Sequence, residues 1–463
     1  MWIYVFNDDE RKAWSGTIAL DVSPKSRWKF ELVRHAEPRD MYSAEPFGSA
    51  SVVPALLDYQ QRCTIIRPIV LKTDPGTVGV GFEAMRTLIS GSFQALLRGL
   101  FVESEDVPVF KGLVFDSRAY ALWYGRRPFK REFNSDTRSY DFEVHKPEQE
   151  TLHIPGLGEV SSTSDAAVAL VGDNSEIKSR AYLNIRLQEN LSLKRVMELA
   201  MGLELLFGFL VGFRPKPPVF TLVSSDTERL DDTEIAATGK LEFSGLEWLE
   251  REAPHPMERI SMRGRDGVDL RTVLEHFLAA ETDFVTRIHV VEYGRFFSRN
   301  LNDRFAVLMP VLEDYLGRTY PHQEETGYLE ARDKFFAHVE QAQDPDIQNF
   351  ARKHLKEIDS KAPSLKTLLK RAIDSLNADG FRFSPVLAKR IQTRRARLFH
   401  SPDVLGGSDA NLFYQEVRAA TAILMLHTLR DLGVPISSLA QDVWALRDLA
   451  GFLQPTERTE PQS

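Results

Sequence analysis

The sequence predicts an α+β protein, in which a β-rich, sandwich-like N-terminal domain precedes an all-α helical bundle. Residues 1–190 contain short β-branched or alternating runs separated by turn residues. From about residue 269, apolar residues recur instead with helical spacing. A chain of 463 residues is also too long for one ordinary core. We therefore expect a β-rich domain over 1–260, an all-α domain over 269–453 and a disordered tail over 454–463.

Strands are expected in the first domain wherever β-branched or alternating runs occur between turn signals. The runs are WSGTIALDV, WKFELVRH, CTIIRPIVL, GTVGVGFEAM and RAYLNIRL. DPGT at 74–77 and GDNS at 172–175 predict turns. A helix should begin after Ser192, an N-cap residue type, and end before RPKPP at 214–218. PVFTLVSS at 218–225 then predicts a strand that returns to the first domain.

The polar stretch 226–268 marks the expected domain boundary, and helical periodicity follows it. The periodic segments are LRTVLEHFLAAETDFVTRIHVVEYGRFF, NDRFAVLMPVLEDYLGRTY, TGYLEARDKFFAHVEQAQ, PDIQNFARKHLKEIDS, PSLKTLLKRAIDSLN, SPVLAKRIQTRRARLF, ANLFYQEVRAATAILMLHTLRDLG and ISSLAQDVWALRDLAGFL. Pro345, Pro363, Pro385 and Pro435 stand where helices should begin, as proline often does. Short connections between such helices predict an antiparallel bundle.

Composition excludes several classes of protein. Hydrophobic residues make up 43% and charged residues 27%, the balance of a soluble globular protein. The single cysteine, Cys63, excludes an internal disulfide framework and fits a reducing cytoplasm. The N-terminus lacks a signal-peptide pattern, and two glutamates interrupt the most apolar window, 196–213, which predicts a buried helix. No spacing typical of metal ligands occurs, so we expect no metal and no cofactor. Together with the cysteine count and the lack of a membrane-spanning segment, the composition predicts a cytoplasmic protein without membrane contact.

Positive charge is concentrated in one segment. The net charge is −8, yet residues 351–400 carry thirteen Lys or Arg and four Asp or Glu, a local charge of +9. The rest of the chain therefore sums to −17. A basic segment in an acidic protein indicates a local polyanion site, or else a solvated basic helix face.

Arg395 and His400 are the candidate catalytic pair. They stand in RRARLFHSP, where the helix should end at His400 because Pro402 disfavours a helical conformation at Ser401. Five residues place two side chains about 140° apart on an ideal helix, but a terminal residue can turn back toward the same cleft. The helix dipole favours a protonated histidine at this end, which suits acid–base chemistry near neutral pH.

RNA fits this pair as a substrate, because its 2′-hydroxyl is an internal nucleophile. His400 would move the hydroxyl proton, and Arg395 would stabilise charge that develops on the phosphoryl oxygens. This chemistry needs no metal. The backbone phosphates would be bound by Lys389, Arg390, Arg394 and Arg397.

Two other patterns have simpler structural explanations. Arg271 and His276 share the same spacing, but they lie in the middle of an expected helix, which favours a structural role. Gly79 and Gly81 fit a loose dinucleotide-binding pattern, but the surrounding segment reads as strand, which favours turn glycines.

Two further groups contain residue types that occur in binding sites. His289 and Glu292 could form half a metal site, but no second half is evident. Tyr120, Trp123 and Tyr124 could form a binding face on the first domain, although a core cluster is favoured.

The sequence around the pair resembles a known family. RRARLFHSP resembles the signature of HEPN domains (higher-eukaryote and prokaryote nucleotide-binding), in which Arg-x(4–6)-His closes a bundle helix. FAVLMPVLEDYL resembles the helix of the ApeA-like branch that carries an ALE element, matched here by Val311, Leu312 and Glu313. LFYQEVRAATAILMLHTLRDLG resembles the final helix of that branch, which ends at Leu432-Gly433. RTLISGSFQALLRG and DSRAYALWYGRR resemble the ApeA N-terminal domain more loosely.

This resemblance implies an enzyme, a metal-independent endoribonuclease effector of a prokaryotic anti-phage abortive-infection or toxin-like defence system. Arg395 and His400 would be catalytic, and Glu313 would either orient one of them or simply pack as a helix-surface acid. The resemblance also implies a homodimer through the helical domain, in which two motifs form one composite site. RNA, with tRNA as one candidate, is the expected partner, and a phage or cellular trigger would act on the N-terminal domain.

One residue departs from the family pattern. Many members have a polar residue, often Asn, directly after the motif arginine, whereas this chain has Ala396. The departure removes one hydrogen bond to phosphate or within the site. It keeps open a second hypothesis, a non-catalytic scaffold that binds nucleotide, RNA or protein, with a β-rich half that binds a ligand.

Overall fold

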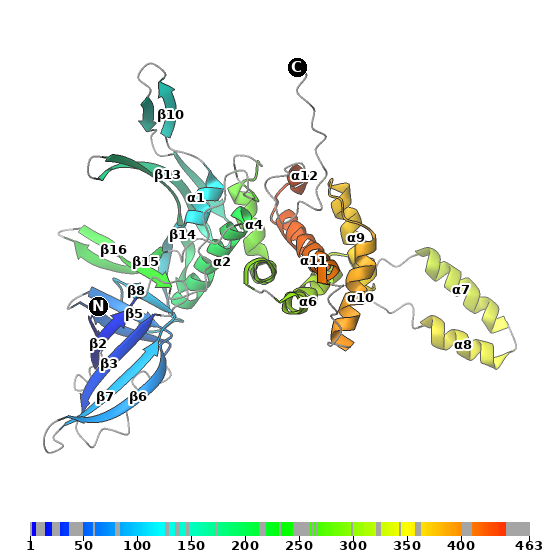
Figure 1. The fold of residues 1–463 in the computed structure, drawn as a ribbon, viewed down its shortest axis with the longest axis horizontal. Helices are drawn as coiled ribbons and strands as arrows, with labels where there is room; N and C mark the ends of the chain where they lie inside the picture. Colours follow the sequence, from blue (N-terminus) through cyan, green and yellow to red (C-terminus); the bar gives the residue numbers. More distant parts are fainter. Residues whose placement is uncertain are drawn as a thin grey trace. The chain divides into compact units, whose positions relative to one another are not determined.

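The computed structural model describes most of the chain and divides it into two packed units. The described residues are 2–5, 14–20, 28–36, 50–58, 61–78, 84–125, 129–134, 139–144, 148–171, 174–212, 219–230, 233–243, 260–261, 263, 267–297, 300–320, 326–341, 344–356, 363–400 and 410–440. Unit 1 is Met1–Glu281 and unit 2 is Thr282–Ser463. The predicted α+β class is confirmed, with a β-rich N-terminal region and a helical C-terminal region (Figure 1). The predicted tail over 454–463 lies outside the described residues.

The strands of unit 1 are antiparallel. They are β1 Trp2–Val5, β2 Trp14–Ala19, β3 Lys29–Ala36, β4 Val52–Leu57, β5 Gln61–Ile66, β6 Ile69–Val78, β7 Ala84–Ser92, β8 Ala95–Arg98, β9 Pro108–Asp116, β10 Phe129–Asn134, β11 Ser139–Val144, β12 Glu148–Ile154, β13 Gly158–Val171, β14 Asn174–Ser192, β15 Val219–Leu230 and β16 Thr233–Phe243. In the described part of the chain, fourteen strands form one sheet in the order β12-β13-β14-β9-β15-β16-β8-β5-β4-β1-β2-β3-β7-β6. The other two strands, β10 and β11, pair with each other.

The strand pairing tests the turn and strand predictions. PVFTLVSS lies largely in β15, which pairs with β9, so the predicted return strand is confirmed. GDNS joins β13 to β14, where Val171 pairs with Asn174. The turn predicted at DPGT, 74–77, is wrong, because these residues continue β6 and pair with β7. β6 is the last strand of the sheet order, and an edge strand accepts a proline, whose missing N–H needs no partner there.

Helix α2, Leu193–Val211, begins and ends as predicted. Ser192 caps it by accepting a hydrogen bond from the backbone N–H of Arg195, and Gly212 ends it with φ 74°. Positive φ costs glycine little, so this helix end suits it. Most of α2 is buried, and it packs on β9 and β14. Among the described helices, none is long and apolar enough to cross a membrane.

The aromatic residues of α1, Arg118–Tyr124, belong to the core of unit 1. Tyr120, Trp123 and Tyr124 are each at most 1% exposed, so the favoured core interpretation is confirmed and a binding face is excluded. The Tyr120 ring contacts Phe207 of α2 edge-on, with centroids 4.9 Å apart. Its hydroxyl lies 2.5 Å from that of Ser162, which gives the buried phenol a polar partner.

Helix α4, Leu270–Ala279, belongs to unit 1, although helical periodicity starts there. Asp269 caps it by accepting a hydrogen bond from the backbone N–H of Thr272. Phe277 is fully buried beside Gly202 of α2, where an added Cβ would lie 3.2 Å from the phenylalanine ring. The boundary between the packed units therefore falls after Glu281, not at the 226–268 stretch that composition marks.

The described part of unit 2 is helical. Its elements are α5 Glu281–Glu292, which starts at the last residue of unit 1, the π-helix η4 Tyr293–Phe297, α6 Leu301–Thr319, α7 Thr326–Gln341, α8 Pro345–Lys356, α9 Leu365–Ala378, α10 Val386–His400, α11 Ala410–Asp431 and α12 Ile436–Leu439. α11 contacts α6, α9 and α10 and has a largely buried sequence, so it is the central helix of the unit.

His427 of α11 is a core residue of unit 2. It is 1% exposed, and its ring lies 5.7 Å from that of Tyr315 and 6.0 Å from that of Tyr320. Burial, and to a smaller extent the charge of Arg430, lower the pKa of His427 to about 3. The imidazole is therefore neutral in the folded protein at physiological pH.

This buried histidine should make the protein less stable in mild acid. Below pH 6.5 the unfolded chain protonates His427, whereas the folded protein does so only near its pKa of about 3. Stability is therefore lost as pH falls below 6.5, by about 2 kcal/mol between pH 7 and pH 5. Urea unfolding at these two pH values should show this loss in the wild type. The His427→Gln variant should show a loss smaller by that amount, and equal losses would contradict the assignment.

Candidate functional site

Helix α10 carries the candidate residues and is anchored by one apolar face. Leu387, Ala388 and Ile391 are buried, and the helix contacts α9 and α11. The preceding turn is held by the Asn377 side chain, which bonds both backbone polar groups of Phe383. α10 extends to His400, the residue at which the sequence predicts its end. The side chain of His400 lies outside the described part of the structure.

Arg395 and Glu313 form a two-point ion pair between α10 and α6. The Arg395 Nη2 donates to Glu313 Oε2 at 2.8 Å, and the Arg395 Nε contacts Glu313 Oε1. The fork of a guanidinium matches a carboxylate in this arrangement, which fixes its orientation as well as its charge. The Arg395 side chain is 42% exposed and that of Glu313 25%, so the pair is accessible from solvent. Two of the three candidate catalytic residues are thus adjacent, although 82 positions separate them.

Arg394 points to a different partner from its neighbour. Its Nε donates to Glu416 of α11 at 2.8 Å, and both side chains are at most 5% exposed. Its guanidinium also lies over the Phe413 ring, 4.9 Å from the centroid. The prediction that Arg394 binds backbone phosphate is therefore wrong for this conformation, because the charge is buried and used to join α10 to α11.

The other predicted phosphate-binding residues lie toward the solvent. Lys389 and Arg397 are exposed, and Arg390 is half-buried. Lys389, Thr393 and Arg397 are spaced by four, so they share one side of α10. Thr393 donates its hydroxyl to the Lys389 carbonyl at 2.9 Å. Lys389 and Arg397 are the charged residues of these three. A polyanion could contact them without displacing core residues.

Ala396 is also exposed on α10, directly after Arg395. A methyl group offers no hydrogen bond, so any phosphate held here relies on arginine and lysine. The site can provide a positively charged, oriented guanidinium and neighbouring cations. Proton transfer would have to come from His400 at the end of the helix.

The other sequence patterns considered as sites either have structural roles or lie outside the described residues. Arg271 Nη1 donates to the His153 carbonyl at 3.1 Å and pairs with Glu275, in agreement with a structural role. His289 is exposed whereas Glu292 is buried. Among the residues that the structure describes, no group of three metal-ligand side chains occurs. The dinucleotide-like stretch from Gly79 lies outside the described residues.

Glu416 was not recognised from the sequence as part of this region. The available signal was a single acidic residue in the apolar stretch of α11, where a buried carboxylate requires a cationic partner. Several arginines on α10 could have supplied it, and only the packing of α10 on α11 selects Arg394.

The site and fold together define a two-part α+β protein whose helical unit contains the basic segment 351–400. Comparison of the chain with protein-family models, with curated proteins and with solved structures found no match. The resemblance of RRARLFHSP to HEPN domains therefore stays a prediction, and the assignment of function depends on the residues themselves.

Proposed function

We propose that unit 2 is a metal-independent endoribonuclease module with Arg395 and His400 as its catalytic residues. The observation that carries the proposal is the two-point ion pair of Arg395 with Glu313, on the helix that extends to His400. An arginine fixed in this way at the surface is suited to stabilising charge on a phosphoryl oxygen. Exposed Lys389 and Arg397 on the same helix supply contacts to the RNA backbone.

The proposed reaction is attack of the RNA on itself. His400 accepts the proton of a 2′-hydroxyl, and the 2′-oxygen forms a bond to the adjacent phosphorus. The bond from phosphorus to the 5′-oxygen breaks, and that oxygen takes up a proton. The products are a 2′,3′-cyclic phosphate and a 5′-hydroxyl. Arg395 stabilises the negative charge on the non-bridging oxygens as the bond forms.

The direct test is cleavage of labelled RNA by the purified full-length protein in excess EDTA. Cleavage with 2′,3′-cyclic phosphate and 5′-hydroxyl ends is expected. An otherwise identical strand with a 2′-deoxynucleotide at the cleaved position should remain intact. Products with 5′-phosphate ends, or cleavage only with added divalent metal, would contradict the mechanism.

Glu313 is proposed as a positioning residue that acts through Arg395. Glu313→Gln removes its charge and one side of the ion pair, so Arg395 loses its fixed orientation. We expect kcat to fall by about tenfold with little change in KM, since a charge-assisted hydrogen bond contributes about 1.5–3 kcal/mol. Asp314→Asn is the matched control, because Asp314 is exposed on the same helix. A rise in KM without a fall in kcat would reject the positioning role. Equal effects of both variants would also reject it.

A non-catalytic scaffold is the second candidate, and exposed Ala396 favours it. Without a polar side chain next to Arg395, the unit would bind RNA or nucleotide without turning it over. In that case the protein would bind RNA tightly and release it intact, and Arg395→Ala would not change the affinity. The larger role that we propose, as an effector of anti-phage defence that acts as a dimer, applies only to the catalytic candidate.

A further inference from the structure

A groove in unit 1 crosses the face of the sheet that is turned away from α1 and α2. Its lining comes from β9, β12, β13, β14, β15 and β16, and its volume is about 750 Å³. Small-molecule sites typically measure about 300–1,000 Å³. Phe115 of β9 pairs with Leu183 and contacts Phe207 of α2, so these residues face the helices. Because side chains alternate along a strand, Asn184 and Arg186 lie on the other face, where both are exposed.

A β-bulge in β9 turns Lys111 into this groove. Gly112 and Phe110 have partners on both neighbouring strands, β14 and β15, and Lys111 is the extra residue between them. Phe110 and Leu113 are both fully buried, so the two residues between them lie on the side of the groove. Bulges redirect side chains in this way and are common beside functional sites. Gly112 has no side chain, which keeps the groove open beside the lysine.

Three charged side chains from three neighbouring strands line the groove. Lys111 belongs to β9, Arg186 to β14 and Glu159 to β13. In the strand ladders Glu159 lies opposite Arg186, and Arg186 lies opposite Gly112, with neighbouring strands about 4.8 Å apart. Within the described part of the chain, no ion pair joins Glu159 to Arg186, and none involves Lys111. The groove therefore presents two cations and one carboxylate to a ligand.

Neutral hydrogen-bonding side chains also line the groove. Gln149 of β12 and Asn184 of β14 are exposed, and each amide can both donate and accept. Ser161 lies opposite Asn184, and its hydroxyl is 3.0 Å from that of Thr151. A sugar matches these groups, because each of its hydroxyls also donates and accepts.

Two classes of macromolecule fit the groove less well. Among the described residues that line it, none is aromatic, so it lacks the stacking surface that binds single-stranded nucleic acid. Sheets bind extended peptides along an edge strand, through the main chain. β9 and β14 are interior strands, so the groove presents side chains to a ligand.

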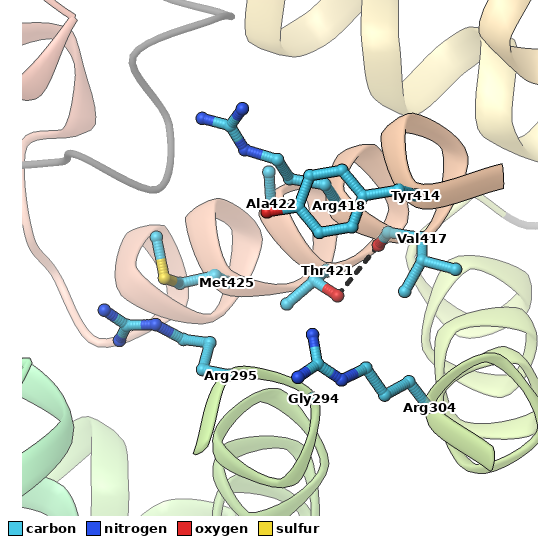
Figure 2. Close-up of a pocket in the computed structure, with 9 residues that line it drawn as sticks. All are labelled: Gly294, Arg295, Arg304, Tyr414, Val417, Arg418, Thr421, Ala422 and Met425. Atoms are coloured by element: carbon cyan, nitrogen blue, oxygen red, sulfur yellow. Dashed lines mark hydrogen bonds between the residues drawn. The ribbon is translucent and has the colours of Figure 1, made fainter. Parts of the chain in front are cut away.

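The arginine-lined pocket of unit 2 is a weaker candidate for an anionic ligand (Figure 2). Its volume is about 100 Å³, and Arg295, Arg304 and Arg418 are among the residues that line it. Each of these arginines already interacts with another group of the protein. The larger groove of unit 1 is therefore the better site for such a ligand.

We infer that the groove of unit 1 binds an oligosaccharide that carries carboxylate groups. Arg186 binds a carboxylate of the ligand through its guanidinium fork, and Lys111 adds a second positive charge. Glu159, Asn184 and Gln149 bind sugar hydroxyls. The inference concerns unit 1 alone, so it does not depend on whether unit 2 cleaves RNA.

Titration calorimetry of the full-length protein with trigalacturonic acid tests this site. Maltotriose, a neutral trisaccharide, is the comparison ligand and should bind at least tenfold more weakly. Lys111→Gln and Arg186→Gln should each weaken the binding of trigalacturonate by about tenfold, as expected for loss of a charge-assisted hydrogen bond. Lys240→Gln is the control, because Lys240 is exposed on β16 and does not line the groove.

A substitution that fills the groove tests the site without changing its charge. Ala236→Phe adds a ring to the lining of the groove and should abolish binding. Ile235→Phe is its control, because Ile235 is 41% exposed and points to the opposite face of the same strand. This variant should bind trigalacturonate as the wild type does. If Ala236→Phe does not fold, the two charge variants decide the outcome.

Three results would overturn the inference. They are absence of binding to the wild type, equal weakening by Lys240→Gln, and unchanged binding by a folded Ala236→Phe variant. Tighter binding of an oligouridylate or of an acidic peptide at the same groove would also overturn it, because the groove would then serve another class of ligand.

Discussion

Replacement of His400 by alanine is expected to abolish RNA cleavage while leaving RNA binding almost unchanged. General acid–base catalysis by a histidine typically contributes about 10²–10⁴-fold to a rate, so cleavage in EDTA should fall below detection. The affinity for RNA should be retained because it depends on the exposed cations of α10, Lys389 and Arg397. The substitution of His400 leaves both of them in place. The measurement is the single-turnover rate of RNA cleavage, together with an RNA Kd at the same salt concentration.

The matched control for this prediction is His276→Ala. His276 stands five residues after Arg271 in α4, the same spacing as the candidate pair, and Arg271 is bound to His153 and Glu275. This variant should cleave RNA at the wild-type rate. Induced expression should stop bacterial growth for the wild type and the control, and should be harmless for His400→Ala at equal abundance. Unchanged cleavage by His400→Ala would reject the catalytic assignment.

Replacement of Glu416 by alanine is expected to destabilise unit 2 strongly, because it disrupts the buried ion pair that joins α10 to α11. It leaves the charge of Arg394 buried without its carboxylate, since both side chains are at most 5% exposed. Removal of one partner from a buried ion pair typically costs about 3–5 kcal/mol of unfolding free energy. Urea unfolding of the full-length protein should show this loss in the transition of unit 2.

Two further variants make this prediction specific. Arg394→Leu combined with Glu416→Leu should recover most of the stability, because no uncompensated charge remains. Asp314→Ala breaks the exposed Arg318–Asp314 pair, 2.9 Å long, and should cost less than about 1 kcal/mol. A loss for Glu416→Ala no greater than that for Asp314→Ala would show that the buried pair does not stabilise the unit.

The sequence by itself determined the division into strands and helices and the ends of particular elements. Ser192 and Gly212 predict and form the two ends of α2, because capping and positive φ depend on local residue types. The return strand β15 follows from β-branched alternation. Arg395 and Glu313 could also be selected as candidates, because the family resemblance marks both segments.

Only the tertiary structure decided which charged residue meets which partner. Arg394 and Arg395 are adjacent and chemically identical, yet one is buried against Glu416 and the other forms an accessible pair with Glu313. Successive residues on a helix point about 100° apart, so the packing of α10 on α9 and α11 assigns their roles. Local sequence patterns do not predict such contacts, because the contacts depend on how each helix is rotated and packed.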